Sequence, residues 1–256
     1  MVTCTEPIST DPTAAVVHPL LRMRWEALTY LHWALPPDAV ARRLPRGLEP
    51  DLHDGRAYVG LVPFRMAGIR LGSVGERVVP GGLPLPFGAF PETNVRTYVV
   101  GPDGGRGVYF HSLDITRWAP TVVARLGYRL PYAAARMRLA RRGDRTAYRA
   151  TRRWPAPRGA TSHAIIEVGE PRPPAQQTSL DVFLSARWSL YAPTPRGHVL
   201  RARVDHAPWP LRTARVLHLD DRLVAAAGYD LAGRGPDHVL AADAVEVAVG
   251  VPERVG

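Results

Sequence analysis

Apolar and polar residues alternate over many short stretches of this chain, which is the pattern of half-buried β-strands. The pattern is clearest in 92–100 and 107–115, where a glycine-rich turn between the two runs predicts a β-hairpin. A second hairpin is predicted around Gly143 and Asp144. Its strands and the other expected strands are 133–142, 145–154, 162–168, 25–35, 188–192, 199–206, 214–219 and 239–249.

Helical patterns are few and short. Pro36 and Pro37 open a short amphipathic helix that ends near Leu44, and Thr178 and Ser179 precede a second helix over 180–186, with a hydroxyl at its start to cap it. Further short helices are expected at 117–126 and 221–227. Because the expected strands far outnumber the helices, we predict a β-rich α+β fold, either a closed or nearly closed antiparallel barrel or two packed sheets.

Turn and loop signals divide the strands. Asp54 and Gly55 predict a tight turn before the strand 56–66, because both residue types tolerate a positive φ. Residues 67–90 are mostly glycine, proline and small apolar residues, and we expect them to form a long loop. Such a loop is either a lid over a site or a mobile excursion, and we favour the lid.

The 256 residues are enough for one large domain or two small ones. Prolines interrupt any regular element in residues 1–21, which we expect to be a flexible leader. Residues 22–256 are expected to form a single domain. The only cysteine, Cys4, excludes an internal disulfide, and we expect a cytoplasmic protein with no membrane span.

All 33 basic residues are arginine, and the formal net charge is +10. The absence of lysine excludes a side-chain Schiff base, a pyridoxal anchor and the lysine of a phosphate-binding loop. A GC-rich coding sequence explains it without any functional reason. Arginine is densest between Arg136 and Arg158, but no recognised nucleic-acid motif accompanies it, so no specific nucleic-acid partner is expected.

One strand carries a conspicuous polar face. Successive side chains of a strand point to opposite sides, so four polar residues of 92–98 share one face, namely Glu92, Asn94, Arg96 and Tyr98. Facing a cavity, they would supply an acid, an amide, a cation and a phenol for a small-molecule site. The alternative is that this face lies against water, as in many antiparallel strands.

The second strand of the same hairpin adds Tyr109, His111, Ser112 and Asp114. A histidine beside carboxylates and an arginine is a workable acid–base set, with Glu92, His111 and Asp114 as candidate catalytic residues and Ser112 as a substrate contact. Strand alternation places His111 and Asp114 on opposite faces unless a β-bulge intervenes. No histidines have zinc-site spacing, so neither a metal nor a cofactor is expected.

The segment 205–211 has two prolines around an indole, which fix the chain sharply after a strand. Trp209 either packs over one end of the barrel or stands with His206 at the rim of the cavity as a substrate contact. Packing is the favoured interpretation.

Several segments together resemble the YqjF-like family of unknown function, which is grouped with the acetoacetate decarboxylase-like superfamily. They are LTYLHWALPPDAVARRLPRGLEPDLHDGRAYVGLVPFRM, FPETNVRTYV, GVYFHSLD, LPYAAARM, ARWSLY and DHAPWPLRTA. The resemblance implies a cone-like β-barrel around an internal cavity and likens Glu92 to a cavity glutamate, which favours an inward polar face. Acetoacetate decarboxylases use a lysine in the region that GVYFHSLD resembles, where this chain has His111, Ser112 and Asp114.

We therefore expect a cofactor-independent enzyme that acts by acid–base chemistry on an anionic or carbonyl metabolite, as a cyclase, dehydratase, isomerase or lyase without a lysine imine. Arg96 would anchor the substrate. The alternative is a noncatalytic barrel that binds a metabolite through the same residues, because a fold alone does not decide function. The sequence leaves the substrate, the reaction and the oligomeric state open.

Overall fold

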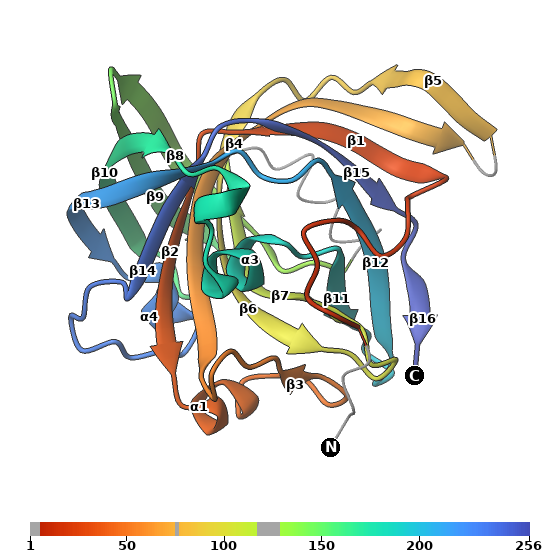
Figure 1. The fold of residues 1–256 in the computed structure, drawn as a ribbon, viewed down its shortest axis with the longest axis horizontal. Coiled ribbons are helices and arrows are strands. Elements are labelled where there is room, and N and C mark those ends of the chain that lie inside the picture. Colours follow the sequence, from red (N-terminus) through yellow and green to blue (C-terminus); the bar gives the residue numbers. More distant parts are fainter. Residues whose placement is uncertain (1–5, 75–76, 117–128) are drawn as a thin grey trace.

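The computed structural model describes residues 6–74, 77–116 and 129–256, which form a strand-rich fold with few helices (Figure 1). The strands join into one 16-stranded sheet. In chain order they are β1 (Pro19–Glu26), β2 (Leu28–Leu35), β3 (Glu49–Pro50), β4 (Ala57–Val74), β5 (Arg77–Pro84), β6 (Phe90–Val100), β7 (Arg106–Ile115), β8 (Tyr132–Arg142), β9 (Arg145–Trp154), β10 (Thr161–Pro171), β11 (Ser189–Pro193), β12 (Val199–His206), β13 (Leu211–Asp221), β14 (His238–Ala242), β15 (Val245–Gly250) and β16 (Glu253–Val255).

The described helices are short: α1 (Pro37–Ala41), the 3₁₀ turn η1 (Pro174–Gln176), α3 (Ser179–Ser185) and α4 (Leu223–Ala226). Helix α3 begins with a capping box, in which the Thr178 hydroxyl accepts from the Asp181 amide and the Asp181 carboxylate accepts from the Thr178 amide. In the described part of the chain, no helix has the length and apolar character that crossing a membrane requires.

The strand pairings close into two rings that share β4, β6 and β7. The first ring follows β1, β15, β12, β11, β7, β6 and β4, and the pairing of β1 with β4 closes it. The second ring follows β7, β8, β9, β10, β13, β14, β2, β4 and β6. Most pairings are antiparallel, but β7 pairs in parallel with β8 and with β11, which the antiparallel expectation did not include.

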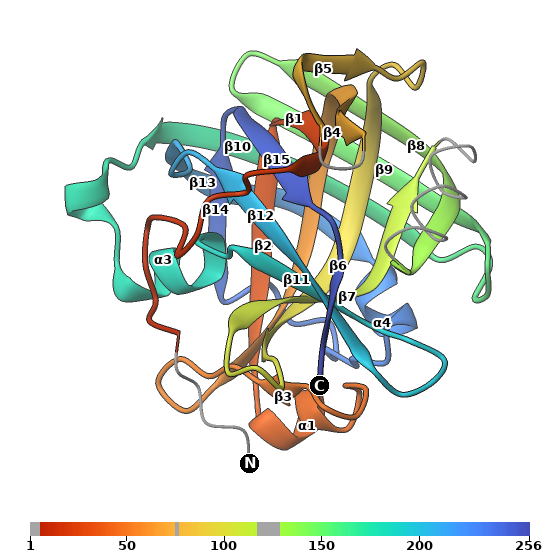
Figure 2. The ribbon, with the colours of Figure 1, turned by 90° about the vertical axis from the view of Figure 1, so that its right-hand side faces the viewer.

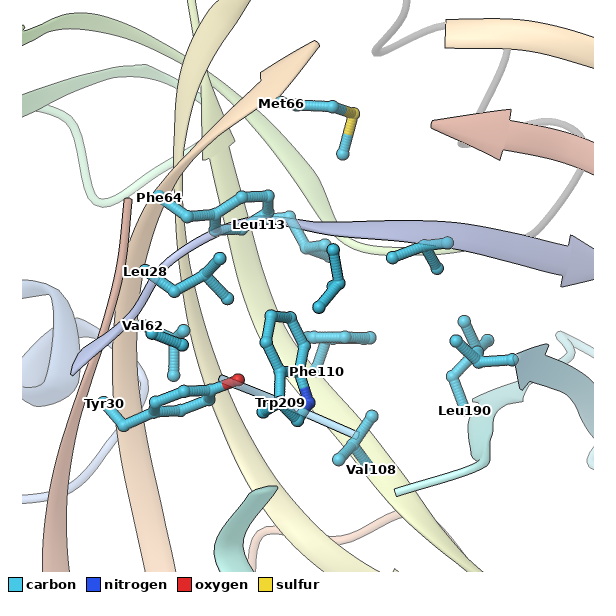
Figure 3. Close-up of a cluster of buried hydrophobic side chains, with 14 of the residues drawn as sticks. Leu28, Tyr30, Val62, Phe64, Met66, Val108, Phe110, Leu113, Leu190 and Trp209 are labelled. Carbon is cyan, nitrogen blue, oxygen red and sulfur yellow. The ribbon is translucent and has the colours of Figure 1, made fainter. Parts of the chain in front are cut away.

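The shared strands give each ring its own core. Even-numbered positions of β6 face the first ring, and Val95 on the opposite side packs into the second core with Leu61 of β4. Figure 3 shows the first core, where large side chains from β2, β4, β7 and β11 converge with Trp209 on a common space. One strand therefore carries a polar, functional-looking face and an apolar core face at once.

The two predicted hairpins are confirmed as β6–β7 and β8–β9, and β10 is the expected third strand beside β9. The expected strand 25–35 is instead two strands, because Ala27 has a φ of 48° and turns the chain between β1 and β2. The expected strand 239–249 is likewise divided into β14 and β15. The expected helix 117–126 lies outside the described residues.

The expected long loop 67–90 is wrong. Strand β4 continues to Val74 and pairs with both β1 and β5, so its backbone groups are satisfied in a sheet rather than by solvent. Two glycines make this extension possible. Gly68 takes a φ of 58° at an irregularity in the β1–β4 register, and a Cβ on Gly72 would lie 2.6 Å from the carbonyl oxygen of Pro19.

Of the expected leader 1–21, residues 19–21 belong to β1, and residues 6–18 are held against the first ring. The Glu6 carboxylate accepts from the Arg106 amide at 2.6 Å and pairs with Arg201 at 3.4 Å, and the Ser9 carbonyl accepts from the Trp188 indole at 3.0 Å. The segment then passes beside α3, as Figures 1 and 2 both show.

Candidate functional site

A cavity of about 100 Å³ lies inside the first ring. Drug-sized ligands occupy pockets of about 300 Å³ or more, and one liquid water takes about 30 Å³, so this space suits a small metabolite. Most of its wall is apolar, with side chains such as Phe64, Phe110 and Trp209. The polar members of the lining are Glu92, Asn94, Arg96, Ser185, Arg187, Ser189 and His206.

Glu92 is the acid of this cavity. On β6 it lies between Phe64 of β4 and Ile115 of β7, and the residue is only 2% exposed. Burial, together with the charge of Asp114, raises the pKa of the Glu92 carboxyl to about 8. Its Oε2 atom has no hydrogen-bond partner among the described residues. A carboxyl that titrates near neutral pH therefore stands in an apolar wall.

Arg96 lies on the same side of β6 as Glu92, and Asn94 stands between them. One terminal nitrogen donates to the Tyr98 hydroxyl and to the Leu184 carbonyl, both at 3.1 Å, while Nε is buried and has no partner in the described part of the chain. Among the ion pairs of the described residues, none joins Arg96 to Glu92 or to another carboxylate. The Asn94 side-chain oxygen is also buried and unpartnered within the ranges that the structure describes. These polar groups are thus not paired with one another.

Arg187 reaches the same cavity from the segment between α3 and β11. Its NH1 donates to the Asp51 carboxylate at 2.6 Å and its Nε to the Phe183 carbonyl at 2.8 Å, whereas NH2 is buried without a partner among the described residues. Burial lowers the pKa of this guanidinium, and the neighbouring Asp51 opposes the change. The sequence reasoning missed Arg187, since no periodic pattern distinguishes one arginine in a short connection.

His206 and Trp209 both line the cavity at the end of β12. The His206 ring lies between two indoles, with centroids 4.5 Å from Trp188 and 4.8 Å from Trp209, and its Nδ1 lies 2.7 Å from the Ala207 carbonyl. Burial lowers the pKa of His206, which favours the neutral ring. Trp209 also stacks on Trp25, so this residue packs against other aromatic side chains and lines the cavity as well.

Tyr98 lies beneath the cavity lining rather than in it. Its hydroxyl donates to the Leu184 carbonyl at 2.7 Å. His32 Nε2 lies 2.6 Å from the hydroxyl oxygen of Tyr98. Burial and the charge of Arg96 lower the pKa of His32 far below its ordinary value. Because Tyr98 donates to the carbonyl, a neutral His32 that donates from Nε2 completes this network.

His111, Ser112 and Asp114 do not join Glu92 in the cavity, which corrects the expected acid–base set. A β-bulge at His111 shifts the register between Val95 and Arg96, and Ser112 and Asp114 then face away from the lining. Asp114 forms a two-pronged ion pair with Arg152 at 2.8 and 2.6 Å, and Ser112 bonds to both partners.

His111 instead contacts the Tyr229 hydroxyl through Nε2 at 2.8 Å, and burial lowers its pKa to about 4. Alternation alone could not reveal this arrangement, because an unpaired residue inside a strand reverses every position beyond it. Within the ranges 6–74, 77–116 and 129–256, no three metal-ligating side chains cluster so as to hold an ion.

Comparison with known proteins identifies the chain's relatives. The family model DUF2071, described as an uncharacterized conserved protein, matches residues 22–246. The uncharacterized protein YqjF of Bacillus subtilis (strain 168) is 31% identical over 195 residues, which cover 76% of each chain.

Solved structures share the fold at low sequence identity. An acetoacetate decarboxylase superposes with a TM-score of 0.62 at 15% identity, covering 96% of this chain and 91% of the other. The enduracididine biosynthesis enzyme MppR complexed with pyruvate has a TM-score of 0.57 at 15% identity, covering 95% and 93%. At these identities the similarity establishes the β-rich, acetoacetate decarboxylase-like fold and no particular reaction.

Proposed function

Because this chain belongs to the DUF2071 family and has the fold of acetoacetate decarboxylase-like enzymes, we propose that it is a cofactor-independent enzyme that acts by acid–base chemistry on a small carbonyl metabolite. One observation carries the proposal. Glu92, with a pKa raised to about 8, stands in an apolar cavity beside buried polar atoms that have no partner among the described residues.

Glu92 would be the general acid and base. At neutral pH it holds a proton that it can donate to a substrate oxygen, and once ionised it can remove a proton from a carbon next to a carbonyl. The electron pair of that C–H bond then forms a C=C double bond, the π pair of the carbonyl moves onto its oxygen, and an enolate results. Arg96 would stabilise the new negative charge, which the apolar wall would otherwise disfavour.

This proton transfer differs from the imine route of a lysine enzyme. The sequence contains no lysine, so no side chain can form a Schiff base with the carbonyl. Enolisation begins with this loss of a proton, and so do dehydration, cyclisation and lyase reactions that proceed through an enolate. The pyruvate complex of MppR supports small oxo acids as the first compounds to test.

Proton transfer can be measured before the physiological substrate is known. Proton NMR in D₂O follows the exchange of the pyruvate methyl protons for deuterium, and we expect wild-type protein to catalyse it and Glu92→Gln to lose it. The same substitution at exposed Glu246 on β15 is the matched control and should retain exchange.

A screen against cell metabolites, by thermal shift and mass spectrometry, widens the test to other substrates. The screen is repeated with Glu92→Gln and Arg96→Ala. A metabolite that both variants retain with unchanged affinity would disprove the assignment of the site. A metabolite that wild-type protein binds but never converts would identify a binding protein rather than an enzyme.

A further inference from the structure

The cavity has a cationic end made by two arginines that come from distant parts of the chain. Arg96 projects from β6, and Arg187 follows α3. Both guanidinium groups pack on the ring of Tyr98, with their central carbons 5.4 and 4.9 Å from its centroid. Because both cations contact the same ring, their central carbons lie no more than about 10 Å apart.

The charges at this end do not balance among the described residues. Asp51 is the carboxylate that pairs with Arg187, and the same carboxylate also pairs with Arg106. The acceptors of Arg96 in the described part of the chain are neutral, namely the Tyr98 hydroxyl and the Leu184 carbonyl. A buried cation without an anionic partner is costly, so two arginines and one shared carboxylate favour the arrival of a further negative charge.

Each arginine also retains a donor for that charge. Nε of Arg96 and NH2 of Arg187 are buried and unpartnered among the described residues. Other nitrogens of the same two side chains do donate hydrogen bonds. Guanidinium N–H groups match carboxylate oxygens in geometry and form strong, charge-assisted hydrogen bonds with them.

We infer that Arg96 and Arg187 together bind the carboxylate of the substrate, so that the cavity selects short monocarboxylates that also carry a carbonyl group. This inference rests on the site of the proposed function and deepens it by naming the substrate class and a second anchoring residue. The carboxylate lies at the Arg96 end of the polar strip of β6, and the reacting atoms lie toward Glu92, with Asn94 between them.

Asp51 is a positioning residue in this arrangement. Its carboxylate holds Arg187 and neutralises one charge, which leaves the site with an affinity for a single carboxylate rather than two. The volume of about 100 Å³ further restricts the substrate to a short chain, and the apolar wall favours alkyl groups over further polar ones.

Pyruvate and pyruvamide test the inference, because they have the same number of heavy atoms and differ in charge. Calorimetry or ligand-detected NMR gives the two dissociation constants. A charge-assisted hydrogen bond contributes about 1.5–3 kcal/mol, so we expect wild-type protein to prefer pyruvate by roughly 10- to 100-fold. Arg96→Gln and Arg187→Gln should each remove most of this preference.

Two further variants keep the outcome decisive. Asp51→Asn combined with Arg187→Gln removes both charges of the buried pair, so that no unpaired carboxylate is left to unfold the protein. Arg201→Gln is the matched control, because Arg201 is also a largely buried, ion-paired arginine but does not line the cavity. The double variant should lose the preference, and the control should keep it.

Equal affinity for pyruvate and pyruvamide, binding of neither, or a preference that survives in Arg96→Gln and in the double variant overturns the inference. Its failure is separable from failure of the proposed function. Suppose that Glu92→Gln protein keeps the preference for pyruvate and that wild-type protein shows no proton exchange. The carboxylate site then stands, and the proposed enzymatic activity is refuted.

Discussion

Glu92 should make this protein less stable as the pH rises, and Glu92→Gln should abolish that dependence. The carboxyl titrates near pH 8 in the folded protein, against an ordinary value of 4.5. The folded state thus holds the proton more tightly than the unfolded chain between these values. The favourable contribution to the free energy of unfolding is complete below pH 4.5 and is lost as the pH rises through 8.

The magnitude follows from the shift. One pKa unit corresponds to 1.36 kcal/mol, so the change from 4.5 to about 8 is worth roughly 5 kcal/mol in total and about 3 kcal/mol by pH 7. Glutamine has nearly the same shape and stays neutral. We expect Glu92→Gln to match wild-type stability near pH 4.5 and to exceed it by these amounts at the higher pH values.

Urea unfolding of both proteins, followed by tryptophan fluorescence at several pH values from 4.5 to 8.5, measures the difference. Glu246→Gln controls for the loss of one carboxyl from an exposed position of β15. A constant difference between Glu92→Gln and wild-type protein across this range would refute the burial of an ionisable Glu92 in the apolar wall. A gain in stability with a loss of proton exchange would show the cost of keeping the acid there.

Three further substitutions test the supporting structure by urea unfolding. Asp114→Ala should cost about 3–5 kcal/mol by leaving Arg152 buried and unpaired, and a cost no larger than that of an exposed Asp→Ala change would argue against the pair. Thr178→Ala should cost about 1 kcal/mol through loss of the α3 cap, with Thr178→Ser as the conservative control. Gly101→Ala should cost about 1–3 kcal/mol, because its Cβ would collide with the Tyr191 ring, and neutral stability would contradict that contact.

The local elements were largely readable from the sequence, since alternation and turn residues determine hairpins directly. The hairpins β6–β7 and β8–β9 and the capped helix α3 all follow from patterns within about 25 residues. Closure into two rings was not readable. It depends on β1 pairing with β4 and on β7 pairing in parallel with β8 and β11, which are contacts between distant segments.

The site was readable only along one strand. Alternation put Glu92, Asn94 and Arg96 on one face of β6, and all three line the cavity, because the extra residue of the bulge lies on β7 and leaves the alternation of β6 uninterrupted. The residues of β7 were misplaced by a single bulge, whose sequence carries no clear mark. Arg187 required the tertiary fold, because it reaches the cavity from a connection that has no period of its own.

The two faces of β6 allow the cavity to be changed, by engineering or by evolution, while the second core is kept. Positions 92, 94 and 96 contact the cavity, while Val95 belongs to the core of the second ring. A library that varies only these even positions leaves the second core intact as a folding template, so new chemistries can be explored without rebuilding the scaffold. The side of β6 that faces the cavity can therefore vary while the side that packs in the second core stays the same.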